Sequence, residues 1–183
     1  MTGIKRSAFT VGLAGAALLG AMSVTRAAEP TVINLTQVGC QFIESENGVD
    51  HKYTPKKADD CNAINAKSGA DRLAKAKTLE LKPGKYIFRV KNKNVPYSLG
   101  FWVREHDYNW KNPLHKLNKT SVSGGGLDTG TTKAYVVELK PGKYLYSCPL
   151  NPTPDYNLVV IGSTPSRSPT RPGRGVRIRG RLS

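Results

Sequence analysis

Hydrophobic and polar residues alternate over several short stretches between residues 31 and 162, which is the pattern of half-buried β-strands. β-Branched and aromatic residues dominate these stretches, and Gly, Pro, Asn or Asp residues separate them. The expected strands are 31–37, 86–92, 98–104, 132–139, 143–148 and 156–162. Short strands with turn signals between them predict an all-β domain, either a sandwich or a Greek-key barrel.

Two of these strands follow the same seven residues, Glu-Leu-Lys-Pro-Gly-Lys-Tyr. This heptapeptide occurs at 80–86 and again at 138–144. Pro-Gly is a turn signal, so each copy is expected to form a strand–turn–strand corner within one antiparallel β structure. Two copies are too few for a solenoid array.

Two segments between the strands are less regular. Residues 40–77 run from Cys40 through a polar loop to Cys61, and then through an Ala-, Leu- and Lys-rich stretch that favours a short helix. Gly69 is expected to divide or end that helix. Residues 105–131 contain a Gly triplet that fits neither a P-loop nor a dinucleotide fingerprint, so we expect a flexible connection there.

The two ends of the chain differ in composition from the middle. Residues 1–28 combine Lys5 and Arg6 with an apolar run and small residues, which is typical of a cleavable signal peptide. Residues 164–183 are rich in Arg and contain no acidic residue, so we expect a disordered tail. This tail either contacts an anionic surface weakly or has no specific role.

The net charge of the domain at 29–163 bears on whether it binds nucleic acid. The chain has 28 Lys and Arg residues against 13 acidic residues, a formal net charge of +15. Much of this excess lies in the two terminal segments, so the domain itself is only moderately basic. It also lacks the clustered aromatic and Arg residues of a single-strand binder, and we expect no specific nucleic-acid partner.

The closing segment, "KYLYSCPLNPTPDYNLVVIG" (143–162), resembles the end of a cupredoxin, the blue-copper fold of plastocyanin and azurin. Cupredoxins commonly end with Pro-Gly-x-Tyr-x-aromatic-x-Cys, a ligand loop and a hydrophobic strand. "NVPYSLGFWV" (94–103) likewise resembles the stretch that carries the first His ligand of that family. The resemblance implies a cupredoxin-like Greek-key β-sandwich of six to eight strands with a short helical insertion. It also implies a periplasmic protein of electron transfer or copper handling.

The copper ligands of that family are mostly missing from this chain. A type 1 site needs two His, one Cys thiolate and usually a weak axial Met. Cys148 lies where the resemblance places the Cys ligand, but Tyr97 stands where the first His is expected. No His follows His115, and the only Met residues are Met1 and Met22. An ordinary type 1 copper site therefore cannot be built from this sequence.

Two hypotheses for the function remain. The leading one is a copper-related or other metal site that is not type 1, with Cys148 as the main candidate ligand. Weaker candidate ligands are His51, His106, Tyr97 and Asp155, and none of them has a diagnostic spacing. The alternative is a metal-free scaffold that docks a periplasmic protein through the 148–156 loop. The expected docking residues are Pro149, Asn151, Pro152, Pro154 and Tyr156. Electron transfer ranks below both hypotheses, and no motif predicts an enzyme.

The three cysteines allow three pairings. An exported domain meets oxidising conditions, so one disulfide is expected. We favour Cys40–Cys61, because these two residues bracket the irregular insertion. Cys148 is then a free thiol, either a small buried side chain or a reactive group.

Overall fold

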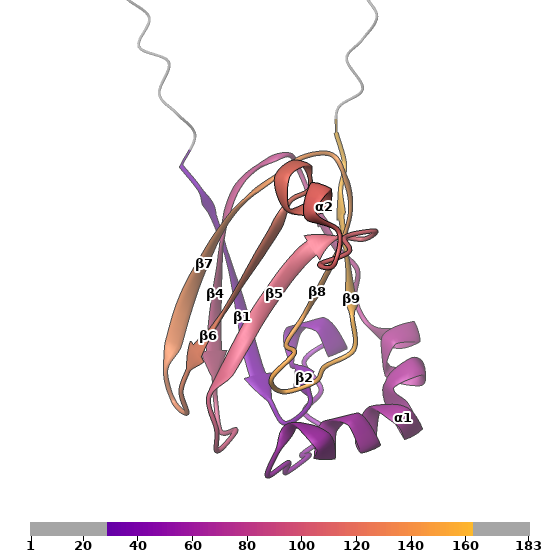
Figure 1. Cartoon of the computed structure of the whole chain (residues 1–183). Helices are drawn as coiled ribbons and strands as arrows, with labels where there is room; N and C mark the ends of the chain where they lie inside the picture. Colours follow the sequence, from indigo (N-terminus) through magenta and orange to yellow (C-terminus); the bar gives the residue numbers. More distant parts are fainter. Residues whose placement is uncertain (1–28, 163–183) are drawn as a thin grey trace, which may run out of the picture.

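The computed structural model describes residues 29–162, and these residues form two β-sheets packed face to face (Figure 1). The first sheet has the order β2-β1-β4-β7, with β1 at Thr31–Val38, β2 at Gln41–Phe42, β4 at Gly84–Asn92 and β7 at Thr132–Leu139. The second has the order β3-β9-β8-β5-β6, with β3 at Leu79–Leu81, β5 at Leu99–Glu105, β6 at Ser121–Leu127, β8 at Gly142–Ser147 and β9 at Tyr156–Val160. The helical elements are the 3-10 turn η1 at Glu44–Glu46, α1 at Ala58–Lys75 and α2 at Pro113–Asn118.

The predicted fold class, a Greek-key β-sandwich with a helical insertion, is confirmed. All six predicted strands form within two residues of their expected bounds, and β2, β3 and β6 come in addition. Residues 29–162 therefore contain nine strands, one more than the expected six to eight. The predicted signal peptide (1–28) and disordered tail (164–183) lie outside the described residues. Within residues 29–162, no helix is long and apolar enough to cross a membrane.

The strand β6 corrects the expected flexible connection at 105–131. Its Gly124 is aligned with Phe101 of β5, and the two backbones approach closely. A Cβ atom on Gly100 would lie 2.8 Å from the carbonyl oxygen of Gly124. The Gly triplet is therefore part of a paired strand, because glycine permits this close approach between backbones.

Two pairings are parallel, which corrects the expectation of an antiparallel structure. β1 runs parallel to β4, and β3 runs parallel to β9, while the remaining pairs are antiparallel. The chain passes repeatedly from one sheet to the other, and two of these crossings lie between β3 and β4 and between β7 and β8. Neighbouring strands therefore come from distant parts of the sequence, and local patterns do not reveal their relative direction.

Both heptapeptide copies form these crossings between the sheets, and both do so with the same contacts. The hydroxyl of Tyr86 donates to the carbonyl of Lys82 at 2.7 Å, and that of Tyr144 donates to the carbonyl of Lys140 at 3.0 Å. The glycines before these tyrosines, Gly84 and Gly142, have φ angles of 154° and 157°. The repeated sequence therefore gives a repeated corner.

The core between the sheets is strongly aromatic. The ring of Phe42 lies 6.0 Å from that of Phe101 and 5.8 Å from the rings of Tyr146 and Tyr156. Phe101 also contacts Phe88 at 5.2 Å. Burying side chains of this size supplies most of the hydrophobic driving force for such a domain.

The insertion between β1 and β3 folds against one end of the sandwich. The predicted disulfide is confirmed, since Cys40 and Cys61 are bonded with a Cα–Cα distance of 5.1 Å. The helix α1 is longer than predicted and continues through Gly69, which is buried. The cost of a glycine inside a helix, about 1 kcal/mol, is smaller than the gain from tertiary contacts along this face.

Candidate functional site

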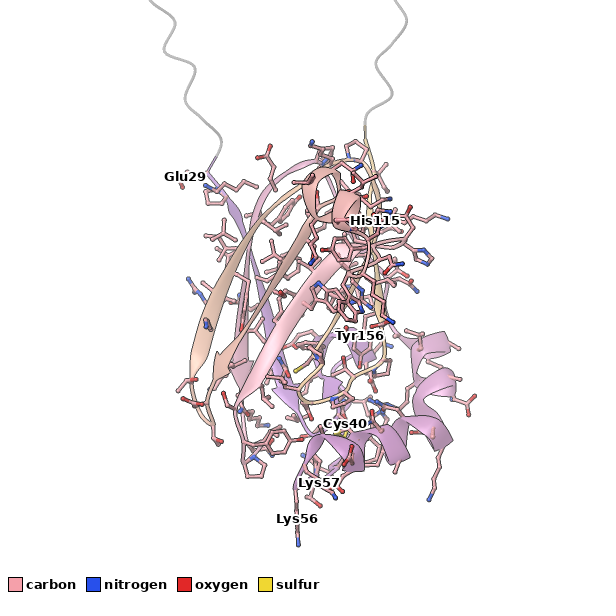
Figure 2. The ribbon with its side chains drawn as sticks, viewed as in Figure 1. Glu29, Cys40, Lys56, Lys57, His115 and Tyr156 are labelled. Carbon is pink, nitrogen blue, oxygen red and sulfur yellow. A yellow bond between two sulfur atoms is a disulfide. The ribbon has the colours of Figure 1, made fainter. Side chains whose placement is uncertain are left out.

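The loop after β8 lies at the end of the sandwich that carries the disulfide, α1 and β2 (Figure 2). Cys148 is buried there, with 1% of its surface exposed, and it is the free cysteine of the described residues. Its backbone N–H donates to Thr153 Oγ1 at 3.1 Å, and the N–H of Asn151 donates to its sulfur at 3.2 Å. These two bonds fold the loop back on Cys148.

Asn151 connects this loop to the opposite sheet. Its side chain is fully buried, and its Oδ1 accepts a hydrogen bond from the backbone N–H of Cys40 at 2.9 Å. Its Nδ2 donates to the carbonyl oxygen of Val38 at 2.9 Å. The Tyr97 hydroxyl lies 3.5 Å from the same Oδ1. The amide of Asn151 is therefore satisfied by the protein itself.

The thiol of Cys148 is held in its neutral form. Burial raises its pKa, and hydrogen bonds from the backbone at Gly100 and Asn151 oppose that rise only in part. Gln37 also contacts this thiol, and its Nε2 donates to the carbonyl of Gly100 at 2.7 Å. Among the described residues, Gln37 Oε1 is the buried side-chain oxygen without a hydrogen-bond partner.

Of the four weaker candidate ligands, the structure brings only Tyr97 close to Cys148. His51 lies on the insertion, where its Nε2 is 2.7 Å from Glu46 Oε2. Asp155 is half exposed and forms an ion pair with Arg104 at 2.7 Å. His106 follows the far end of β5, a strand that starts beside Cys148. Tyr97 is the one weaker candidate near the thiol, and burial raises the pKa of its hydroxyl.

This donor set does not fit a type 1 copper ion. In the part of the chain that the structure describes, no group of three or more His, Cys, Asp or Glu side chains is close enough to hold a metal. The polar side chains near Cys148 carry amides, phenols and a hydroxyl, whereas a blue-copper site needs two imidazoles beside the thiolate. The copper hypothesis in its ordinary form therefore has no support from the geometry.

The predicted docking loop is also corrected in part. Asn151, Pro154 and Tyr156 are buried, so they cannot meet a partner directly. Pro149 is exposed and Pro152 is half-buried. Two further apolar residues are exposed at this end, Leu150 with 46% of its surface and Pro96. Neither residue was predicted from the sequence, because a turn pattern does not show which side chains point outward.

A buried ionic cluster, which was not predicted from the sequence, lies between the insertion and β9. Glu46 has a 5% exposed surface, and its carboxylate accepts hydrogen bonds from Arg72 at 2.7 and 3.1 Å. The Tyr156 hydroxyl also donates to it, and His51 lies against it. Burial alone would raise the pKa of Glu46, but the bonds from Arg72 and Tyr156 outweigh burial and lower it.

No local signal could have revealed this cluster, since its members come from η1, α1 and β9. The cluster borders a cleft of roughly 400 Å³ that is also lined by Tyr53, Ser68 and Lys75. The Arg72 guanidinium donates to Asn65 and to the Cys40 carbonyl as well as to Glu46. With its donors committed in this way, the guanidinium ties α1 to the sandwich.

Comparison with known proteins gives the following matches. No protein-family model matches the chain, and no curated protein matches it. Among solved structures, auracyanin B is similar with a TM-score of 0.43 and 12% identity, over 74% of this chain and 93% of that one. Lac15 from a marine microbial metagenome is similar with a TM-score of 0.33 and 14% identity, over 75% of this chain and 28% of that one. At TM-scores this low, neither likeness bears on the site or on a ligand.

Proposed function

We propose that this chain is an exported cupredoxin-type scaffold that holds no metal at Cys148 and docks a partner protein through the end of the sandwich. The observation that carries the proposal is the position of Asn151. Its buried amide joins the loop to Cys40 and Val38, and its N–H meets the Cys148 sulfur. Hydrogen bonds therefore do the structural work that a metal would do in this loop.

The docking surface consists of Pro96, Tyr97, Pro149 and Leu150, which we call the end face. Leu150 and the two prolines are exposed, and Tyr97 is half-buried. Proline, tyrosine and leucine together give an apolar surface with little side-chain entropy to lose on binding.

Lysines lie beside the end face. Lys56 and Pro96 line the same shallow cleft of roughly 280 Å³, and Lys93 is exposed nearby in the sequence. Asp60 also lies near Tyr97. The margin of the end face therefore carries both signs of charge and fits a partner with an apolar patch and a margin of mixed charge.

The end face is held rigid before any partner binds. Asn151 fixes the loop from inside, and the Cys40–Cys61 disulfide fixes the segment against which the loop packs. A surface that is already ordered gives up less conformational entropy on association, so modest apolar area suffices for specific binding.

The test combines copper binding with partner binding. The protein is purified from the periplasm, and its intact mass is measured to locate the N-terminus. It is then titrated with Cu(I) and Cu(II). We expect no stoichiometric copper, and no difference between the chain and a Cys148→Ala variant. The chain is then crosslinked to periplasmic proteins, and any captured partner is purified and titrated. Leu150→Asp should weaken that binding by about tenfold or more, whereas Val136→Asp, at an equally exposed residue on β7, should not.

A second candidate function, metal binding at Cys148, is favoured by one observation. The unpartnered Gln37 Oε1 is buried and lies on the side chain that contacts the free thiol. One equivalent of copper that is lost in both Cys148→Ala and Gln37→Leu would support this function and refute the metal-free scaffold. Equal binding of the partner by Leu150→Asp and the unaltered chain would refute the end face as the docking surface.

A further inference from the structure

A second exposed surface lies at the opposite end of the sandwich from Cys148, between β5 and β6. Residues 109–118, here called the α2 knob, contain the short helix α2 (Figure 1). None of the residues of α2 is buried. Three large apolar side chains are exposed on the knob, with exposed fractions of 61% for Trp110, 63% for Leu114 and 85% for Leu117.

These apolar side chains lie outside the hydrophobic core of the described residues. The knob keeps its shape through polar contacts, since Asn112 Oδ1 accepts from the N–H of Leu114 and His115 Nδ1 accepts from the N–H of Asn109. Leu114 and Leu117 are three positions apart, which places them on the same face of the helix. A six-residue helix gains little from its own propensity. Polar contacts therefore hold the knob in shape, and its apolar side chains stay exposed.

The charges around the knob are cationic. The nearest acidic residues, Glu105 and Asp107, are both paired with Lys119. Lys111 and Lys116 are exposed on the knob itself, and the Lys111 ammonium lies 5.6 Å from the Trp110 ring. Lys119 is shared by the two carboxylates, so three lysines face two acids and this group of residues has a net charge of +1. The two lysines on the knob itself, Lys111 and Lys116, lie beside the exposed Trp and Leu side chains.

More positive charge is attached to the same end of the molecule. The N–H of His106, just before the knob, donates to the carbonyl of Lys143, whose side chain is exposed. Gly162 packs on Pro141, which lies two residues before Lys143. A Cβ atom on Gly162 would lie 2.7 Å from Pro141 Cγ. The described chain therefore leaves at this end, and the sequence that follows, 164–183, contains six Arg and no acid.

We propose that the α2 knob binds an anionic lipid surface, with Trp110, Leu114 and Leu117 entering the headgroup region and the lysines contacting the headgroups. Trp and Leu beside Lys are the residue types that favour the interface between water and lipid. Stable peripheral binding needs both an apolar anchor and positive charge, and this end supplies both.

The test measures how the chain from Glu29 to Ser183 partitions onto sedimented vesicles. Every described strand lies between Thr31 and Val160, so this chain keeps the whole sandwich without the apolar N-terminal segment. The vesicles are equal mixtures of phosphatidylglycerol and phosphatidylcholine, or phosphatidylcholine alone. We expect binding to the anionic vesicles that is at least about tenfold tighter than to the neutral ones.

Two variants and a matched control separate the knob from the Arg-rich segment. A triple variant, Trp110→Ser with Leu114→Ser and Leu117→Ser, should bind anionic vesicles about tenfold more weakly, and Lys111→Glu with Lys116→Glu should do the same. The control, Val32→Ser with Val136→Ser, also removes exposed apolar side chains, with exposed fractions of 40% and 49%, but should bind normally.

Full binding by the triple variant would assign the affinity to residues 164–183 and overturn the proposal. Absence of anionic-vesicle binding, with or without a knob-dependent dimer, would also overturn it.

Discussion

The two ends of this sandwich handle polar and apolar groups in opposite ways. The end that carries Cys148 buries ionic and amide side chains, namely Glu46, Arg72 and Asn151, and meets their hydrogen-bonding needs inside the protein. The end that carries α2 exposes Trp110 and Leu117 on a framework of surface contacts. The first arrangement makes a rigid end whose stability depends on every partner in the network. The second makes a surface that can be altered without disturbing the fold.

The two ends should differ most in how much unfolding free energy is lost when an ion pair is broken. Glu46→Ala leaves the Arg72 guanidinium buried without its carboxylate, and should lower the free energy of unfolding by about 3–5 kcal/mol. The Glu46 and Arg72 side chains are only 4% and 6% exposed, so water cannot replace the lost partner. Asp107→Ala breaks an exposed pair at the α2 end and should leave stability essentially unchanged. Urea unfolding followed by tyrosine fluorescence measures both.

The same carboxylate predicts acid sensitivity. Because its pKa is lowered in the folded state, its stabilising effect is complete above the ordinary value of 4.5 and is lost as the pH falls through the lower, folded value. The unfolding free energy should therefore decline below pH 4.5, and less steeply in Glu46→Gln. A Glu46→Ala variant as stable as the unaltered chain, with the same acid profile, would contradict the role given to this cluster.

The disulfide is expected to have the next largest effect. Cys40 and Cys61 are 21 residues apart, and a crosslink over a loop of this size stabilises by about 3 kcal/mol. Cys40→Ser with Cys61→Ser should lower the melting temperature accordingly and raise hydrogen exchange across α1. The α2 end, which has no crosslink among the described residues, should keep its exchange rates. Uniform loss of protection at both ends would show that the disulfide does not act locally.

Asn151 should come third. Its replacement by Ala leaves the Cys40 N–H and the Val38 carbonyl without partners in a buried setting, at a cost of about 2 kcal/mol. Asn112, which caps α2 at the other end, is only half-buried, and Asn112→Ala should cost less, about 1 kcal/mol. Thermal unfolding of the two variants side by side gives the ratio. A larger loss for Asn112 would reverse the comparison.

The two repeated corners, which lie toward the α2 end, should each contribute less than Asn151 does. Tyr86→Phe and Tyr144→Phe each remove one hydroxyl bond to a lysine carbonyl, and each should cost about 1 kcal/mol. The Tyr144 hydroxyl also accepts from the Lys140 N–H at 3.2 Å, so its loss should be slightly the larger. Matched urea unfolding curves test this order, and an effect confined to one corner would show that the repeat is not equivalent in the folded protein.

Much of the candidate site followed from local sequence, and part of it did not. The free state of Cys148 and the Cys40–Cys61 disulfide were predicted from cysteine positions around the insertion, and both are confirmed. The burial of Asn151 and Tyr156 was not predicted, because proline-rich loops usually lie on the surface. The side chain of Asn151 binds the Val38 carbonyl on β1 and the N–H of Cys40. Both partners are far from Asn151 in the sequence, so the residues around Asn151 do not indicate them.

The two copies of the heptapeptide show which features the sequence determined locally and which ones the tertiary structure decided. Pro-Gly turns, alternating strands and the Tyr-to-Lys contact depend on residues close together in the chain, so both copies form the same corner. One copy nevertheless leads into β4 of the first sheet, and the other into β8, which ends at the buried Cys148. The parallel pairings, the Glu46–Arg72 cluster and the exposed α2 knob likewise depend on contacts between distant segments. Those contacts are selected by the packing of the whole core, a property that no short stretch of sequence contains.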